Sequence, residues 1–140
     1  RRRHMRVPMR VVIADDQPRI RSALRLVVEQ DAALDLVGEA ADATALLRKL
    51  TMTAPPDLVL LDWELPGLSG RQLLRLLRFE RPEIRVLVLS GRPEAEEAAR
   101  AAGADAFVGK GDSTSHLLQV LQELRDSRDR GGEEDIYRGR

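Results

Sequence analysis

Five polar residues stand at or directly after the ends of short apolar segments, and their types suit chemistry on a phosphoryl group. Asp15 and Asp16 follow one segment, Asp62 and Ser90 follow two others, and Lys110 comes soon after the last. Neighbouring carboxylates repel one another unless a cation joins them, and oxygen ligands favour a hard ion such as Mg²⁺. A carboxylate can attack phosphorus, while an ammonium and a hydroxyl can bind the transferred oxygens. These residues predict a Mg²⁺-dependent phosphoryl-transfer site, provided that the fold brings them together.

The segments that carry these residues alternate with helical patterns. Five short apolar runs are typical of strands, and several are continuous, as expected for strands covered on both faces. They cover residues 11–13, 34–37, 58–61, 86–89 and 106–108. Helical spacing of apolar residues follows, from Ile20, Leu46, Leu73 and Leu117 onwards. This alternation predicts an α/β domain with a five-stranded parallel sheet and five helices, in which ligands bind beyond the carboxyl ends of the strands.

Local signals mark where the helices begin. Pro18 suits a first helical turn, and Ser69 with Gln72 forms a capping-box pattern. Either Asp112 or Ser113 can cap the last helix. These signals agree with the helix positions that the apolar spacing predicts.

One predicted helix, at residues 93–102, has only alanines on its apolar face. Alanine favours a helix but buries little area. We therefore expect this helix to be the most loosely held element, which suits a part that moves.

Composition narrows the class of protein. The 140 residues suit one domain, and 23 basic residues balance 23 acidic ones, which argues against a nucleic-acid-binding surface on this chain. Cysteine is absent, which excludes disulfides and Cys-based metal sites. No apolar run is long enough to span a bilayer, so we expect a cytoplasmic domain with no membrane partner.

The two ends differ from the middle. Residues 1–5 are predicted to be an expression remnant or a disordered basic arm. Residues 127–140 are charged, contain glycine and have little to bury, which predicts a tail or linker.

The sequence from Arg6 to Asp126 resembles a response-regulator receiver domain of two-component signalling. The matching segments are VVIADD at 11–16, LVLLDWELPGLSG at 58–70, VLVLSG at 86–91 and FVGK at 107–110. Each fragment is weak alone, but their order on successive predicted strands is specific. The resemblance implies a doubly wound flavodoxin-like sheet of order 2-1-3-4-5.

The resemblance also implies roles for individual residues. Asp62 would be the phosphoacceptor, and Mg²⁺ would be held by Asp15, Asp16, Asp62 and the backbone carbonyl of Glu64. Phosphate-binding groups would come from Ser90, Gly91 and Lys110, and the switch pair would be Ser90 and Phe107.

The resemblance implies a signalling switch rather than an enzyme with its own substrate. The phosphodonor would be a histidine kinase or a phosphotransfer protein. Transcription and DNA contact would be regulated through an output domain absent from this chain, as in receivers that precede a helix-turn-helix domain. A homodimer would use the predicted fourth helix, fifth strand and fifth helix.

Departures from the family pattern leave alternatives open. Gly111 stands where the family usually has proline, and Glu64 and Arg92 occupy positions that tune dephosphorylation in the family. A stand-alone or unphosphorylated receiver-like interaction module is the main alternative. An Asp-dependent phosphohydrolase fits less well, because Asp62 lies on the third predicted strand.

Overall fold

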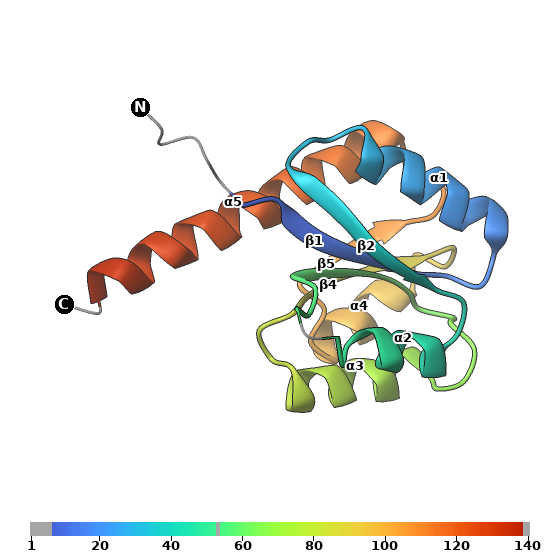
Figure 1. The fold of residues 1–140 in the computed structure, drawn as a ribbon. Helices are drawn as coiled ribbons and strands as arrows, with labels where there is room; N and C mark the ends of the chain where they lie inside the picture. Colours follow the sequence, from blue (N-terminus) through green and yellow to red (C-terminus); the bar gives the residue numbers. More distant parts are fainter. Residues whose placement is uncertain (1–6, 53, 139–140) are drawn as a thin grey trace.

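A single parallel sheet forms the centre of the molecule in the computed structural model, which describes residues 7–52 and 54–138. Its five strands lie in the order β2-β1-β3-β4-β5, and every pairing is parallel (Figure 1). The predicted fold class and strand order are thereby confirmed. The strands are β1 (Met9–Ala14), β2 (Leu34–Ala40), β3 (Leu58–Asp62), β4 (Arg85–Ser90) and β5 (Ala106–Gly109).

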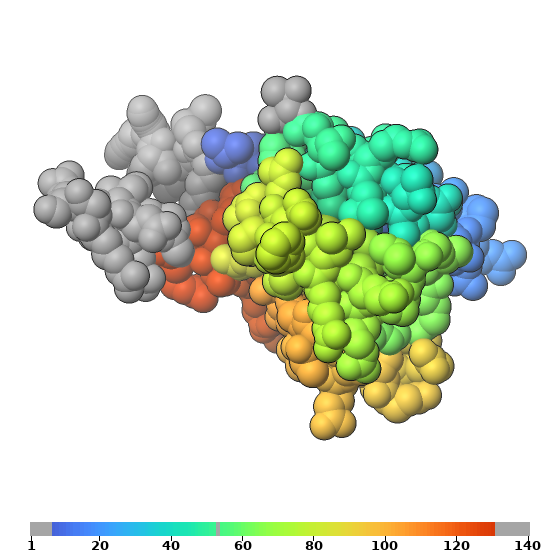
Figure 2. Space-filling view, turned by 90° about the horizontal axis from the view of Figure 1, so that it is seen from below, coloured from blue at the N-terminus to red at the C-terminus, as the bar shows by residue number. Residues whose placement is uncertain are grey.

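Helices cover both faces of the sheet. Helices α1 and α5 lie on one face and α2, α3 and α4 on the other; Figure 2 views the molecule from the α3 side. The helices are α1 (Pro18–Glu29), α2 (Ala43–Lys49), α3 (Gly70–Glu80), α4 (Ala95–Ala101) and α5 (Thr114–Arg138).

Two separate apolar cores result from the alternation of side chains along each strand. Val12 and Val59 face α2, α3 and α4, whereas Val11 and Leu58 face α1 and α5. All four are fully buried, because a strand covered on both faces has no solvent side. This explains why the strand sequences are continuously apolar.

The predicted helix starts are confirmed. Pro18 occupies the first turn of α1, and Ser69 and Gln72 form both hydrogen bonds of the capping box at α3. At α5, the Ser113 hydroxyl accepts a hydrogen bond from the His116 amide at 3.1 Å. Ser113, rather than Asp112, therefore caps this helix.

The fourth helix is short and buries little, as the sequence indicated. It spans Ala95–Ala101 rather than residues 93–102, and the buried residues within it are Ala95 and Ala99. Since each alanine removes little apolar area from water, α4 is weakly attached by apolar contacts.

Helix α5 extends past residue 126 to Arg138, through much of the segment predicted to be a tail or linker. Arg128 fastens its continuation to the domain, donating to the Val7 carbonyl at 2.9 Å and lying 3.5 Å from Asp57 Oδ2. The linker role stays a prediction, because a linker can itself be helical. The prediction for residues 1–5 lies outside the described residues. Within the described ranges, no helix combines the length and apolar character needed to cross a bilayer.

Candidate functional site

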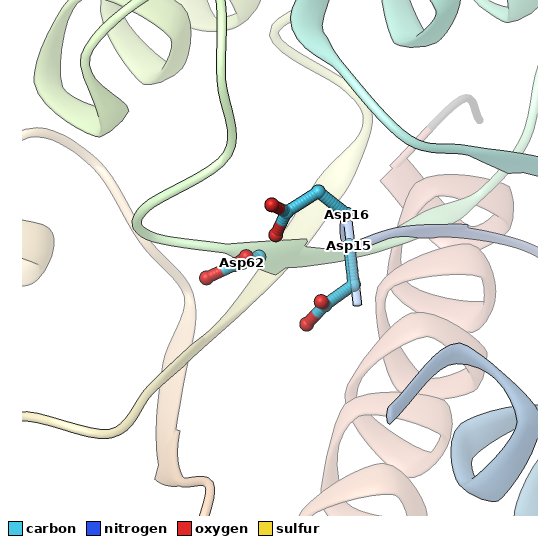
Figure 3. A group of neighbouring side chains, drawn as sticks. All are labelled: Asp15, Asp16 and Asp62. Atoms are coloured by element: carbon cyan, nitrogen blue, oxygen red, sulfur yellow. The ribbon is translucent and has the colours of Figure 1, made fainter. Parts of the chain in front are cut away.

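Three aspartates meet at the carboxyl edge of the sheet, as predicted. Asp15 and Asp16 follow β1, and Asp62 ends the neighbouring strand β3. One carboxylate oxygen of each lies within 4.8 Å of the others. Figure 3 shows the three side chains gathered at this edge. Asp15 and Asp62 are each 1% exposed, whereas Asp16 is exposed. The site thus has a buried floor and one carboxylate at its open side.

Lys110 brings a positive charge to this cluster from the end of β5. Its Nζ lies 2.9 Å from Asp15 Oδ2 and 3.2 Å from Asp62 Oδ1. It also donates to the side-chain oxygen of Gln17 at 3.2 Å. The chain contains only two lysines, and this one supplies a compact charge that reaches two carboxylates.

The buried charges perturb one another. Burial raises the pKa of Asp62, and the nearby Asp15 charge adds to this, while the Glu64 amide and Lys110 oppose it. Burial disfavours the Lys110 charge, but the contacts with Asp15 and Asp62 outweigh that effect and raise the pKa of Lys110. The site therefore favours the charged form of Lys110. Its positive charge is not sufficient to offset the effect of burial on the ionised form of Asp62.

The donor set fits a divalent cation. Three carboxylates and one ammonium have a formal charge of minus two when all are ionised, and the available ligands are oxygens. Asp15 Oδ1 accepts from the Gln17 amide at 2.9 Å, which orients this carboxylate toward the edge. Such a charge and ligand type match Mg²⁺, which commonly retains waters and binds phosphate oxygens.

Ser90 is fully buried at the end of β4, next to the aspartates, but its hydroxyl already has partners. It donates to the Glu64 carboxylate, at 3.1 Å from Oε2 and 3.3 Å from Oε1. It also accepts from the Arg92 amide at 3.0 Å. The Arg92 guanidinium in turn holds Glu64, with Nη2 3.1 Å from Oε2.

The side-chain contact between Glu64 and Ser90 was not predicted from the sequence, which indicated a metal-binding carbonyl for Glu64 and, by resemblance, a position that tunes dephosphorylation. A signal was present, because Glu64 and Arg92 each follow the ends of adjacent parallel strands by two residues. Asp62 pairs with Leu89 in the β3–β4 register, which brings the loops after the two strands together. Residues that lie the same number of positions after the ends of two neighbouring strands are therefore candidates for side-chain contact.

The remaining predicted residues lie around this edge. Gly91 is exposed in the loop after β4, and Phe107 is half-buried on β5, where it packs against the core that α2, α3 and α4 cover. Phe107 also lines an open hollow between α4 and α5. The structure thus brings the candidate metal and phosphate ligands to one edge, while the switching role of Phe107 and phosphate binding by Gly91 stay predictions.

Trp63, Gly67 in the loop and Gly70 at the start of α3 shape the segment after Asp62. Gly67 has a φ of +112°, which an L side chain rarely adopts, so glycine suits the backbone at this position. Gly70 instead permits close approach, because a Cβ there would lie 2.5 Å from Trp63 Cε3. Trp63 therefore packs over the first turn of α3, close to the site.

Comparison with known proteins gives the same family as the motifs. Residues 11–122 match the family described as "Response regulator receiver domain". A putative transcriptional regulator of Pseudomonas aeruginosa is 39% identical over 120 residues, which are 82% of this chain and 56% of that protein.

Solved structures agree. A LuxR-family two-component response regulator from Aurantimonas superposes with a TM-score of 0.76 at 30% identity, covering 84% of each chain. RcsB of Salmonella enterica serovar Typhimurium, bound to promoter rprA in the presence of the phosphomimetic BeF₃⁻, has a TM-score of 0.79 at 27% identity, covering 85% of this chain and 61% of that one.

The match is long but spans only part of its relatives. The chain covers about half the length of the curated proteins that it resembles, 56% in the case of the Fimbriae Z protein of Salmonella typhimurium. The family match, over residues 11–122, contains β2 to β5, most of β1 and the aspartate cluster. The chain therefore belongs to the family of response regulator receiver domains.

Proposed function

We propose that this domain is a phosphorylation-dependent switch in which Asp62 accepts a phosphoryl group with the help of Mg²⁺. The observation that carries the proposal is the cluster of Asp15, Asp16 and Asp62 with Lys110 at the carboxyl edge of the sheet. A buried carboxylate beside two others and a lysine has little structural use. The same set suits binding a cation and a phosphoryl group together.

In the proposed transfer, a carboxylate oxygen of Asp62 attacks phosphorus. A new oxygen–phosphorus bond forms as the nitrogen–phosphorus bond of a phosphohistidine donor breaks, and the histidine nitrogen keeps the electron pair. The product on Asp62 is an acyl phosphate. Bound Mg²⁺ would supply charge neutralisation, with Asp15, Asp16, Asp62 and the Glu64 carbonyl as its protein ligands. Lys110 would pair with a phosphoryl oxygen.

The switch would then act through Ser90, Gly91 and Phe107. The Ser90 hydroxyl would turn to donate to the new phosphoryl oxygens, supported by the Gly91 amide. Phe107 would turn inward as Ser90 moves, and the weakly attached α4 would shift with it. Phosphorylation selects this state only through contacts that the other state lacks.

The partners follow from the family and its relatives. A histidine kinase or phosphotransfer protein is the proposed donor, and transcription regulation through a DNA-binding output domain outside this chain is the proposed result. The face formed by α4, β5 and α5 is the proposed homodimer surface, since it includes Phe107 and the short helix. A cytoplasmic location fits these partners.

A mass measurement tests the proposal. The protein is incubated with Mg²⁺ and acetyl phosphate, and its intact mass is compared with that of Asp62→Asn. We expect a gain of one phosphoryl group that requires both Mg²⁺ and Asp62. Asp35→Asn serves as the matched control, because Asp35 is an exposed aspartate on β2 and should leave the gain intact.

Three outcomes would contradict the proposal. A gain that persists in Asp62→Asn would identify another acceptor. No gain with acetyl phosphate or with phosphorylated kinases would support an unphosphorylated interaction module. Steady hydrolysis of many phosphoesters would instead support a phosphohydrolase.

A further inference from the structure

The Ser90 hydroxyl can serve only one acceptor at a time. A hydroxyl carries one proton, and in this structure Ser90 donates it to the Glu64 carboxylate, with Oγ 3.1 Å from Oε2. The Arg92 amide occupies an acceptor position of the same oxygen at 3.0 Å. A phosphoryl group on Asp62 could therefore accept a hydrogen bond from Ser90 only if the hydrogen bond from Ser90 to Glu64 broke.

The Arg92 side chain holds the Glu64 carboxylate in position to accept the hydrogen bond from Ser90. Arg92 donates to Glu64 Oε2 from both Nη2, at 3.1 Å, and Nε, at 3.3 Å. The two charged side chains are 42% and 59% exposed, so their ion pair alone contributes little to stability. The hydrogen bond to Ser90 differs, because a charged acceptor meets a fully buried hydroxyl.

We propose that Glu64 is an internal latch that holds the Ser90 hydroxyl in its unphosphorylated orientation and so opposes activation. The latch rests on the proposed function of Asp62. The Glu64 carboxylate and a phosphoryl oxygen would compete for the same hydroxyl hydrogen of Ser90, which can be donated to only one of them at a time. Arg92 positions the latch, and Glu64 sets how strongly a phosphoryl group must bind to open it.

The latch predicts a gain in affinity when Glu64 is removed. The probe is beryllofluoride with Mg²⁺, titrated into the protein and followed by calorimetry. Glu64→Ala should bind beryllofluoride about three- to tenfold more tightly than the wild type, the range expected for loss of one competing hydrogen bond. Since Glu64 is exposed, this substitution should leave the fold intact.

A double-mutant cycle separates the latch from simple charge repulsion. Ser90→Ala weakens beryllofluoride binding by itself, and in that background Glu64→Ala should change the affinity less than about twofold, because there is no hydroxyl to compete for. If the threefold or larger gain persists without Ser90, the latch is wrong and Glu64 acts through its charge alone. Glu94→Gln removes an exposed negative charge from the same loop region and should leave the affinity unchanged.

A second cycle tests the contact in the free protein. Chemical unfolding without Mg²⁺ should show that Glu64→Ala and Ser90→Ala are less than additive, since each removes the same hydrogen bond. Additive effects would overturn the latch. A wild-type protein that fails to bind beryllofluoride through Asp62 would overturn the proposed function instead, which distinguishes the two failures.

Discussion

Replacing Asp62 with asparagine should make the metal-free protein more stable. Asp62 is 1% exposed, and burial raises its pKa. A carboxyl group whose pKa is higher in the folded state binds more protons when folded. Its ionisation therefore destabilises the fold as the pH rises from the unfolded to the folded pKa, and the loss is complete above both.

The size follows from the charges around Asp62. At an effective dielectric constant of about 20, the Asp15 charge, taken at the 4.8 Å upper limit of the carboxylate separations, repels Asp62 by about 3.5 kcal/mol, and Lys110 at 3.2 Å attracts it by about 5 kcal/mol. Burial of the ion costs several kcal/mol more, and asparagine can keep the hydrogen bond from the Glu64 amide at 3.0 Å. We expect a net gain of about 1–2 kcal/mol, or roughly 3–10 °C in Tm.

Thermal and urea unfolding in EDTA would measure this gain at pH 7. The difference between wild type and Asp62→Asn should shrink as the pH falls, because protonated Asp62 is neutral like asparagine. Added Mg²⁺ should reverse the order. At 100 times its Kd it would stabilise the wild type by about 2.7 kcal/mol, whereas the variant should gain much less.

Asp16→Asn is the matched control, since Asp16 is an exposed member of the cluster. It should change metal-free stability little and still reduce the Mg²⁺ effect. If Asp62→Asn is as stable as the wild type or less stable in EDTA at pH 7, then burial does not dominate the energetics of Asp62 and the reasoning fails.

Three further substitutions test how the fold supports the site. Gly70→Ala should displace Trp63, because the new Cβ would lie 2.5 Å from the ring, and a change in tryptophan fluorescence would report it. Leu74→Ala should destabilise by about 2–5 kcal/mol in urea unfolding, since Leu74 is fully buried on α3. Glu39→Gln should destabilise at pH 7, because the hydrogen bond from Arg25 lowers the pKa of Glu39. That stability is present above the unfolded pKa, near 4.3, and is lost as the pH falls through the folded value.

Each of these three predictions has a result that would contradict it. An unchanged Trp63 spectrum in Gly70→Ala would mean that the ring has room to move. A cost below about 1 kcal/mol for Leu74→Ala would mean that the core collapses around the gap. A Glu39→Gln defect that persists undiminished at pH 3 would exclude the ionised carboxylate as its cause.

The sequence by itself determined the architecture and the identity of the acidic site. Continuous apolar strands alternating with amphipathic helices allow few arrangements other than a parallel sheet covered on both faces. Because parallel strands share a carboxyl edge, residues placed after β1, β3, β4 and β5 had to meet there. The proximity of Asp15, Asp62 and Lys110 could thus be predicted from the sequence.

Only the tertiary structure decided which side-chain atoms contact one another. Glu64 and Ser90 are 26 residues apart, and their hydrogen bond depends on the path of two loops and on the rotamer of Glu64. The role of Gly70 likewise depends on where the Trp63 ring lies, and the helical continuation of α5 through a charged segment was not evident from its composition. Periodicity reports which face of an element is buried, whereas loop paths and rotamers depend on all the neighbours at once.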